Sequence, residues 1–118
     1  MEKRISIVRH VSEVAPVPCP CGESRRIITA ADEAILGLHV TDLGGARKHY
    51  HQVTTEVYHI LEGEGQIELD GALHEVRPGT TIYIPAGVAH RAIGSLKAVI
   101  ATVPPFDASD EYLCDEEP

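Results

Sequence analysis

Apolar and polar residues alternate in short segments along most of the chain, with the period of two that is typical of β-strands. This alternation predicts strands within residues 4–8, 26–29, 34–40, 57–61, 66–69, 73–76, 80–84, 89–93 and 97–103. Turn signals recur about every 8–12 residues, as they do in β-sandwiches and β-barrels. No segment has the pattern of an amphipathic helix, although residues 30–34 are expected to form one helical turn. The pattern therefore predicts an all-β protein.

Two dipeptides mark the sharpest predicted turns. Asp70-Gly71 predicts a type I′ hairpin, because both central residues of that turn need a positive φ. Pro78-Gly79 predicts a type II turn, since proline sets the φ of the second position and glycine accepts the positive φ of the third. These turns divide the chain into short antiparallel strands.

The composition is that of an ordinary single-domain protein. The chain has 118 residues, of which 43% are hydrophobic and 24% are charged. We expect one domain over residues 1–118, with N-terminal strands and a Cys-Pro loop in residues 1–33 and an acidic tail in residues 104–118. No apolar run is long enough to cross a membrane. The net charge of −8 would repel nucleic acids and anionic membranes, so neither is expected as a partner.

The N-terminal residues bear on the cellular location, and the C-terminal residues bear on how the tail packs. The charged residues 1–4 are not followed by a long apolar stretch, so no secretory signal is predicted and the protein is expected in the cytoplasm. In the acidic tail, Phe106, Tyr112 and Leu113 are expected to dock on the domain, while the last acidic residues stay in solvent.

Cys19 and Cys21 lie two residues apart in a proline-rich segment. This separation is too short for an unstrained disulfide in most backbones, so reduced thiols are expected. A structural zinc site needs four ligands, and Cys114 is the only further thiol. The favoured hypothesis is a proline-stiffened loop with ordinary thiols. In the alternative, one of these thiols reaches the metal site described next.

Three histidines and a glutamate form the candidate functional site. His49 and His51 are two residues apart and face the same side of a strand. The polar residues 52–55 are expected to return the chain antiparallel, so that Glu56 opens the next strand and faces both histidines. His90 follows a Pro-Ala-Gly turn. Three imidazoles and a carboxylate suit a first-row divalent metal, with one or two positions open for a substrate or O₂.

The spacing of these residues resembles the two motifs of the cupin superfamily, and the two motifs together span residues 43–94. The matching residues are His49, His51, Glu56 and Gly63 in the first motif, and Gly79, Pro85, Gly87 and His90 in the second. Two positions differ from the family pattern. The opening glycine of the first motif stands at Gly44 instead of Leu43, and Gly94 replaces the closing asparagine of the second. Neither difference affects a candidate ligand.

The resemblance implies a cupin barrel, which is a jelly roll of two antiparallel sheets, also described as a double-stranded β-helix. It implies that His49, His51, Glu56 and His90 bind one divalent transition metal, which is Fe, Mn, Ni or Zn. The alternative is a cupin that binds its ligand without a metal. The resemblance also implies a homodimer.

Two functions of different classes are consistent with this site. The first is a mononuclear metalloenzyme that acts on a small polar molecule, by dioxygenation at iron or by isomerase or lyase chemistry at a Lewis-acid metal. The second is a module that binds a sugar or a small acid without turnover. A role in assembly through paired sheets is a third hypothesis. The open coordination positions favour the enzyme.

Further polar residues are expected either inside the barrel or on its surface. Tyr58 has the parity of the candidate glutamate ligand and is expected inside the barrel, either as a donor near the metal or as a core aromatic. His59 has the opposite parity and is expected on the surface, and His74 is expected in solvent. Arg25-Arg26 is expected to pair with the acidic surface. The alternative is a guanidinium that faces a carboxylate substrate.

Overall fold

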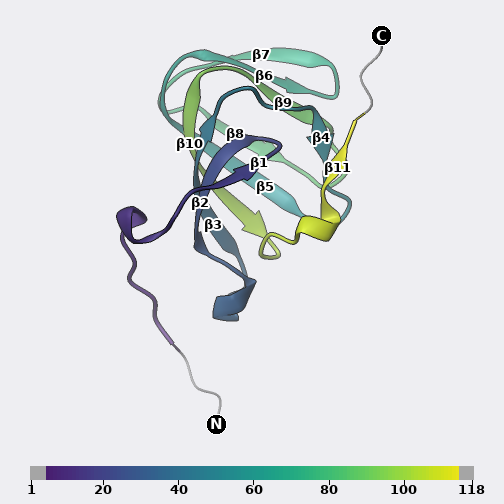
Figure 1. Cartoon of the computed structure of the whole chain (residues 1–118). Helices are drawn as coiled ribbons and strands as arrows, with labels where there is room; N and C mark the ends of the chain where they lie inside the picture. The colour runs from purple at the N-terminus through teal and green to yellow at the C-terminus, as the bar shows by residue number, and fades with distance from the viewer. Residues whose placement is uncertain (1–4, 115–118) are drawn as a thin grey trace.

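Figure 1 shows a computed structural model of the chain, which describes residues 5–114. These residues form two antiparallel sheets that share one apolar core. The six-stranded sheet has the order β1 (Val17–Cys19), β2 (Gly22–Ile28), β3 (Gly37–Leu43), β10 (Leu96–Val103), β5 (Thr55–Glu62) and β8 (Thr81–Ile84). The five-stranded sheet has the order β11 (Tyr112–Leu113), β4 (His49–Tyr50), β9 (His90–Gly94), β6 (Gly65–Leu69) and β7 (Ala72–Val76). This arrangement confirms the predicted jelly-roll barrel.

Among residues 5–114 the helical content is limited to single turns. They are η1 (Val11–Glu13), η2 (Ala30–Asp32) and η3 (Ala108–Asp110). The second of these is the turn that the sequence predicted at residues 30–34. Nowhere in residues 5–114 is there a helix of the length and apolar character that crossing a membrane requires.

The observed strands agree with those that the alternation of apolar and polar residues predicted. Every strand predicted from residue 26 onward is present in the structure, with its ends shifted by a few residues. In β10, Leu96, Ala98 and Ile100 are buried and the residues between them are partly exposed. The Asp70-Gly71 turn has φ values of 47° and 89°, which confirms the type I′ hairpin.

The predicted N-terminal strand is wrong. Residues 1–4 lie outside the described part of the chain, and residues 5–8 form no strand. Ile5 and Val8 are 76% and 99% exposed, so their alternation has no sheet to pack against. The sheet instead begins at β1, within the proline-rich segment that the sequence suggested was a loop.

The expectation of free thiols at Cys19 and Cys21 is also wrong, because the two residues form a disulfide. In the structure, Cys19 pairs with Gly22 across the β1–β2 hairpin, so Pro20 and Cys21 are the two residues of a tight turn. This turn brings the two Cα atoms to 5.2 Å, within the range that a disulfide requires.

The connection between the two motif strands differs from its predicted course. Residues 52–55 were expected to return the chain antiparallel so that Glu56 faces the two histidines. Instead β4 belongs to the five-stranded sheet and β5 to the six-stranded sheet, so this segment crosses from one sheet to the other. The crossing allows residues of both sheets to meet in the barrel interior.

The C-terminal segment docks beside the mouth of the barrel (Figure 1). Tyr112 stacks on Tyr50 with ring centroids 5.2 Å apart, and Phe106 contacts His39 edge to face. Docking of Phe106 and Tyr112 is therefore confirmed, whereas Leu113 is 44% exposed. The acidic residues 115–117, which were expected in solvent, lie outside the described residues.

The disulfide predicts a count of reactive thiols. Denatured protein that has not been reduced should take up one alkyl group, at Cys114, and reduced protein should take up three. Intact-protein mass spectrometry after alkylation measures both numbers. Three alkylated cysteines without reductant would contradict the hairpin disulfide. Protein handled without thiol reagents during purification is the required starting material.

Candidate metal centre

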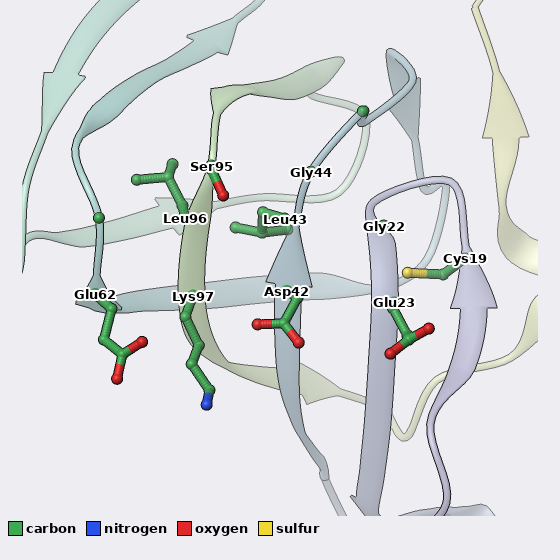
Figure 2. A pocket seen from close by; sticks show the side chains of 12 residues that line it. Cys19, Gly22, Glu23, Asp42, Leu43, Gly44, Glu62, Ser95, Leu96 and Lys97 are labelled. Atoms are coloured by element: carbon green, nitrogen blue, oxygen red, sulfur yellow. The ribbon is translucent and has the colours of Figure 1, made fainter.

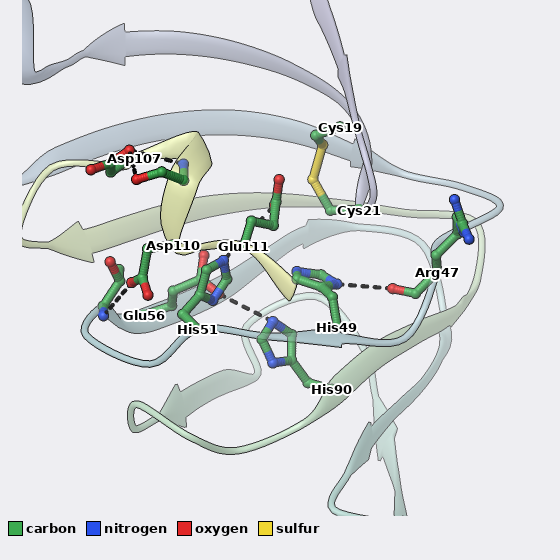
Figure 3. Close-up of polar contacts among 12 residues, drawn as sticks. Cys19, Cys21, Arg47, His49, His51, Glu56, His90, Asp107, Asp110 and Glu111 are labelled. Atoms are coloured by element: carbon green, nitrogen blue, oxygen red, sulfur yellow. Dashed lines mark hydrogen bonds and ion pairs between the residues drawn. A yellow bond between two sulfur atoms is a disulfide. The ribbon is translucent and has the colours of Figure 1, made fainter. Parts of the chain in front are cut away.

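His49, His51, Glu56 and His90 meet inside the barrel, as the motif spacing predicted (Figure 3). One ligand atom from each residue lies within 4.8 Å of those of the other three, and all four side chains are buried. The five-stranded sheet contributes His49 and His90, which are directly paired across β4 and β9. The six-stranded sheet contributes Glu56, from the start of β5. The cluster therefore depends on the packing of both sheets.

Backbone carbonyls orient two of the imidazole rings. The Nδ1 atom of His49 lies 2.9 Å from the carbonyl oxygen of Arg47, and that of His90 lies 2.9 Å from the carbonyl oxygen of Val88. A carbonyl oxygen only accepts, so each Nδ1 carries the proton and donates it. In a neutral imidazole the Nε2 atom then keeps its lone pair. This is the arrangement that histidine ligands of metals use.

The carboxylate of Glu56 faces one of these lone pairs. Its Oε1 atom lies 3.1 Å from His90 Nε2, yet both atoms are buried without a hydrogen bond among the residues described. Burial raises the pKa of Glu56, but the N–H groups and charges of the imidazoles when protonated, His90 first, outweigh it and lower the pKa of this carboxyl group. When His90 is neutral with its proton on Nδ1, the carboxylate oxygen and the Nε2 lone pair lie side by side instead. A cation between them would satisfy both.

His51 lies just beyond β4, between two carboxylates. Its Nδ1 atom is 3.3 Å from Glu56 Oε1, and its Nε2 atom is 3.8 Å from Glu111 Oε1. Burial lowers the pKa of His51, but the two carboxylates outweigh it and the pKa rises. In contrast, burial and the neighbouring His90 lower the pKa of His49. Sequence reasoning did not single out Glu111, which is one acidic residue among several in the tail.

Asp110 holds the segment between His51 and Glu56. Its two carboxylate oxygens accept hydrogen bonds from the backbone N–H groups of Gln52, Val53 and Thr54, over distances of 2.9–3.2 Å. Burial raises the pKa of Asp110, but these backbone donors outweigh it and the pKa falls. The carboxylate thus fixes the crossing loop between the two candidate ligands. The sequence contains no local signal for this long-range contact.

Three glycines of the two motifs occupy positions that a larger residue would disturb or that join the two motifs. Gly87 donates its backbone N–H to the carbonyl of His51, which joins the second motif to the first. Gly63 has φ of 90°, and a Cβ atom there would lie 2.2 Å from the carbonyl oxygen of Ser95. Gly94 has φ of 98°, a left-handed conformation that glycine and, less readily, asparagine adopt. This conformation accounts for glycine at the position where the family pattern has asparagine.

A small cavity of about 20 Å³ adjoins the cluster. Its lining includes His49, Glu56, Tyr58, Glu111, Arg26, His39, Phe106 and the disulfide cysteines. The volume is enough for about one water molecule. A larger hollow of about 710 Å³ is open to solvent, and its lining includes Glu23, Asp42, Glu62 and Lys97 (Figure 2). None of the four clustered residues lines that hollow. The cavity next to the candidate metal cluster is therefore the small one.

Tyr58 lies inside the barrel, as its parity predicted. It is 2% exposed, and its ring is perpendicular to that of His90 with centroids 6.0 Å apart. Burial and the nearby Glu56 raise the pKa of Tyr58 well above its usual value. The phenol therefore keeps its proton at neutral pH, and it can donate a hydrogen bond but cannot act as a general base.

The remaining histidines lie where parity predicted them or carry no prediction. His59 is exposed and its Nδ1 atom lies 2.8 Å from the hydroxyl of Thr81, away from the cavity. His74 is exposed in β7. His39, which no motif identified, is buried and lines the cavity. A search for inward parity in β3 would have found it, because its neighbours Thr41 and Leu43 are buried on the same side.

The side chains of Arg25 and Arg26 have different surroundings. Arg25 donates a hydrogen bond to the carbonyl oxygen of Val14, at 2.6 Å. The guanidinium of Arg26 lies over the ring of Phe106, 4.3 Å from its centroid, and lines the cavity. Within residues 5–114 neither arginine forms an ion pair with an acidic side chain, because the strand directs the two side chains to opposite faces of the sheet.

The model of the cupin domain matches residues 39–101 of this chain, which include both motifs. The chain therefore belongs to the cupin family. An uncharacterised protein of Methanocaldococcus jannaschii is 41% identical over 71 residues, which are 57% of this chain and 57% of that protein. The dimethylsulfoniopropionate lyase DddW of Ruegeria pomeroyi is 31% identical over 64 residues, which are 54% of this chain and 42% of the lyase. The chain thus spans about half the length of these curated relatives.

Solved structures match more of the chain. A protein from Planctomyces limnophilus is 32% identical, with a TM-score of 0.80 over 95% of this chain and 96% of that chain. The nucleoside dehydratase Pac13 of Streptomyces is 14% identical, with a TM-score of 0.82 over 93% of this chain and 92% of its own. At that identity the second match establishes the fold alone.

The role of Asp110 predicts a pH-dependent stability difference. Asp110→Asn should destabilise the fold by about 1–3 kcal/mol at pH 7, because three backbone donors lose their anionic acceptor. The folded-state pKa of Asp110 is lowered, so this contribution is present above the unfolded pKa of about 3.9 and is lost as the pH falls through the folded value. Urea unfolding of both proteins at pH 7 and pH 3 measures the difference.

Asp107→Asn is the matched control for Asp110→Asn. Asp107 caps η3 by accepting from the backbone N–H of Ser109, and asparagine caps equally well. We expect its effect to stay within about 0.5 kcal/mol. Equal effects of the two substitutions would contradict the assigned role of Asp110.

Proposed function

We propose that His49, His51, Glu56 and His90 hold one divalent transition metal, and that the protein is a metal-dependent enzyme acting on a small polar molecule. The observation that carries this proposal is the contact between Glu56 Oε1 and His90 Nε2. These two acceptor atoms are buried 3.1 Å apart without a hydrogen bond in the described part of the chain. A cation is the group that compensates both.

The donor set supports a metal of the first transition row. Neutral imidazoles and one carboxylate suit Fe, Mn, Ni or Zn, and cellular supply decides among them. A bound metal would act as a Lewis acid or, with iron, as a redox centre. The four protein ligands leave coordination positions for a substrate.

The protein's own residues supply orientation and a protonated donor. The carbonyls of Arg47 and Val88 hold the rings of His49 and His90 with their Nε2 atoms toward the centre. Tyr58 is buried beside the cluster with its pKa raised, so it keeps a proton that it can donate to a substrate oxygen. The small cavity excludes most of the water from this site.

One relative by sequence supports lyase chemistry over dioxygenation. DddW is named as a lyase, and a lyase catalyses an elimination. A Lewis-acid metal and a donor such as Tyr58 suit such a reaction, because the leaving group needs a proton or a cation.

The second candidate function is a cupin that binds a small molecule without turnover. The small volume of the cavity favours it, since about 20 Å³ leaves little space for a substrate without movement of the walls. A pure binding module need not depend on metal. Ligand binding that is unchanged by metal removal would support this candidate.

Removal of a ligand predicts loss of metal. Protein purified without a histidine tag should contain close to one equivalent of Fe, Mn, Ni or Zn by elemental mass spectrometry. His90→Ala and Glu56→Gln should reduce that content at least about ten-fold, because each removes one of four donors from a buried cluster. His59→Ala is the control, since His59 is exposed and outside the cluster.

Circular dichroism of each variant separates metal loss from misfolding. Folded His90→Ala and Glu56→Gln proteins that retain full metal would show that the centre is assigned to the wrong residues. A wild-type protein without metal, and without uptake on reconstitution, would overturn the metalloenzyme proposal.

The homodimer and the cytoplasmic location stay predictions. Light scattering at micromolar concentration tests the homodimer.

A further inference from the structure

The cavity has a second polar wall opposite the metal cluster. Arg26 and His39 are paired residues of β2 and β3, and His39 is paired with Ile100 of β10. Ile100 is in turn paired with Tyr58 of β5. All four residues line the cavity, so they form one row across the inner face of the six-stranded sheet. The row ends two residues from Glu56 along β5.

Two nitrogen atoms of this wall lack a hydrogen-bond partner in the described part of the chain. Arg26 Nε and His39 Nε2 are buried without a hydrogen bond within residues 5–114. His39 is only 6% exposed, and buried polar groups are normally hydrogen-bonded. Both residues line the cavity, which makes a bound ligand the natural partner for them.

Packing holds the guanidinium of Arg26 at this wall. It lies over the ring of Phe106, 4.3 Å from the centroid, and the same ring contacts His39 edge to face at 5.8 Å. A planar guanidinium stacked on an aromatic ring loses little further freedom when it binds a ligand. Arg25, one residue earlier, donates to Val14 and does not line the cavity.

The charges of the cavity favour an anion once a metal is bound. The lining contains two carboxylates, Glu56 and Glu111, and one guanidinium, Arg26. Their formal charges sum to −1, and a divalent metal changes the sum to +1. Burial, and the nearby Arg26, lower the pKa of His39 to about 4, so His39 is neutral at pH 7 and offers one N–H donor.

We propose that Arg26 and His39 form a carboxylate-binding subsite, which holds the acid group of a small carboxylic acid while its reacting end faces His49 and Glu56. This inference rests on the proposed metal centre and adds the chemical class of its substrate. Guanidinium and imidazole N–H groups are suited to a carboxylate because both donate hydrogen bonds to its oxygens. The cavity has space for about one water molecule, so even a small acid requires movement of the wall that Phe106 and Glu111 form.

The test compares Arg26→Gln with Arg25→Gln. Both substitutions remove one arginine charge from adjacent residues of β2, but only Arg26 lines the cavity. The probes are glycolate and lactate, with their neutral amides glycolamide and lactamide. Isothermal titration calorimetry measures the affinity of each probe for zinc-loaded wild-type protein and for both loaded variants.

We expect a carboxylate probe to bind the wild-type protein and Arg25→Gln with equal affinity. Arg26→Gln should weaken that binding at least about ten-fold, the scale of a lost charge-assisted hydrogen bond. The amides should bind more weakly and should not distinguish the variants. Equal affinities of the two variants for glycolate and lactate, or no measurable binding of either acid, would overturn the subsite.

Further variants keep the result interpretable if Arg26→Gln is unstable. Arg26→Lys retains the charge and should recover part of the affinity, and His39→Gln should weaken carboxylate binding while Arg26 remains in place. Thermal melting confirms that each variant is folded. A folded His39→Gln protein that binds the acids as tightly as wild type would remove His39 from the subsite.

Metal content separates the two proposals. If all variants load one equivalent of zinc but carboxylate binding does not depend on Arg26, the subsite is wrong and the metal centre stands. If the wild-type protein takes up no zinc, the metal centre is wrong. In that case, glycolate or lactate binding to the metal-free protein that Arg26→Gln abolishes still supports the subsite, and its absence overturns it.

Discussion

Glu56 and His90 bring two buried acceptor atoms within 3.1 Å of each other, and the rest of the site depends on how this contact is compensated. The two residues come from different sheets, so the contact exists only when both sheets have packed. A buried carboxylate without a counter-charge costs several kcal/mol. A cation between the two atoms would turn this unfavourable contact into a stabilising one. The same burial that makes the contact costly therefore makes it selective for a positive charge.

The C-terminal segment supports this centre from outside the two motifs. Asp110 holds the crossing loop through its backbone N–H groups, and Glu111 places a second carboxylate beside His51. Phe106 supports the guanidinium of Arg26 at the opposite wall of the cavity. One short segment thus contributes to the position of the candidate ligands and to the electrostatics around them. Substitutions in the acidic tail should not be treated as changes to an inert surface.

Several parts of the site could be predicted because their signals are local. His49, His51 and Glu56 lie within eight residues, and strand parity is enough to place the two histidines on one side. Parity also placed Tyr58 inside the barrel and His59 outside it. These inferences need only the alternation of a strand, which does not depend on which other strand lies next to it.

Other features depend on contacts between distant segments, and the sequence contained no signal for them. The disulfide of Cys19 and Cys21 depends on the two-residue turn between β1 and β2, which the proline-rich segment did not indicate. Asp110 reaches a loop that lies 56–58 residues away in the chain. Arg26 could not be distinguished from Arg25 until the register of β2 against β3 was known.

The sequence by itself determined the all-β class, the cupin motifs and the four clustered residues, because alternation and spacing act over a few residues. The tertiary structure alone decided that residues 51–54 cross between the sheets, that Asp110 holds this crossing, and that Arg26 and His39 face one cavity. These arrangements follow from the pairing of strands far apart in the chain. The free energy of such pairing depends on how complete surfaces fit together, and no short stretch of sequence contains that information.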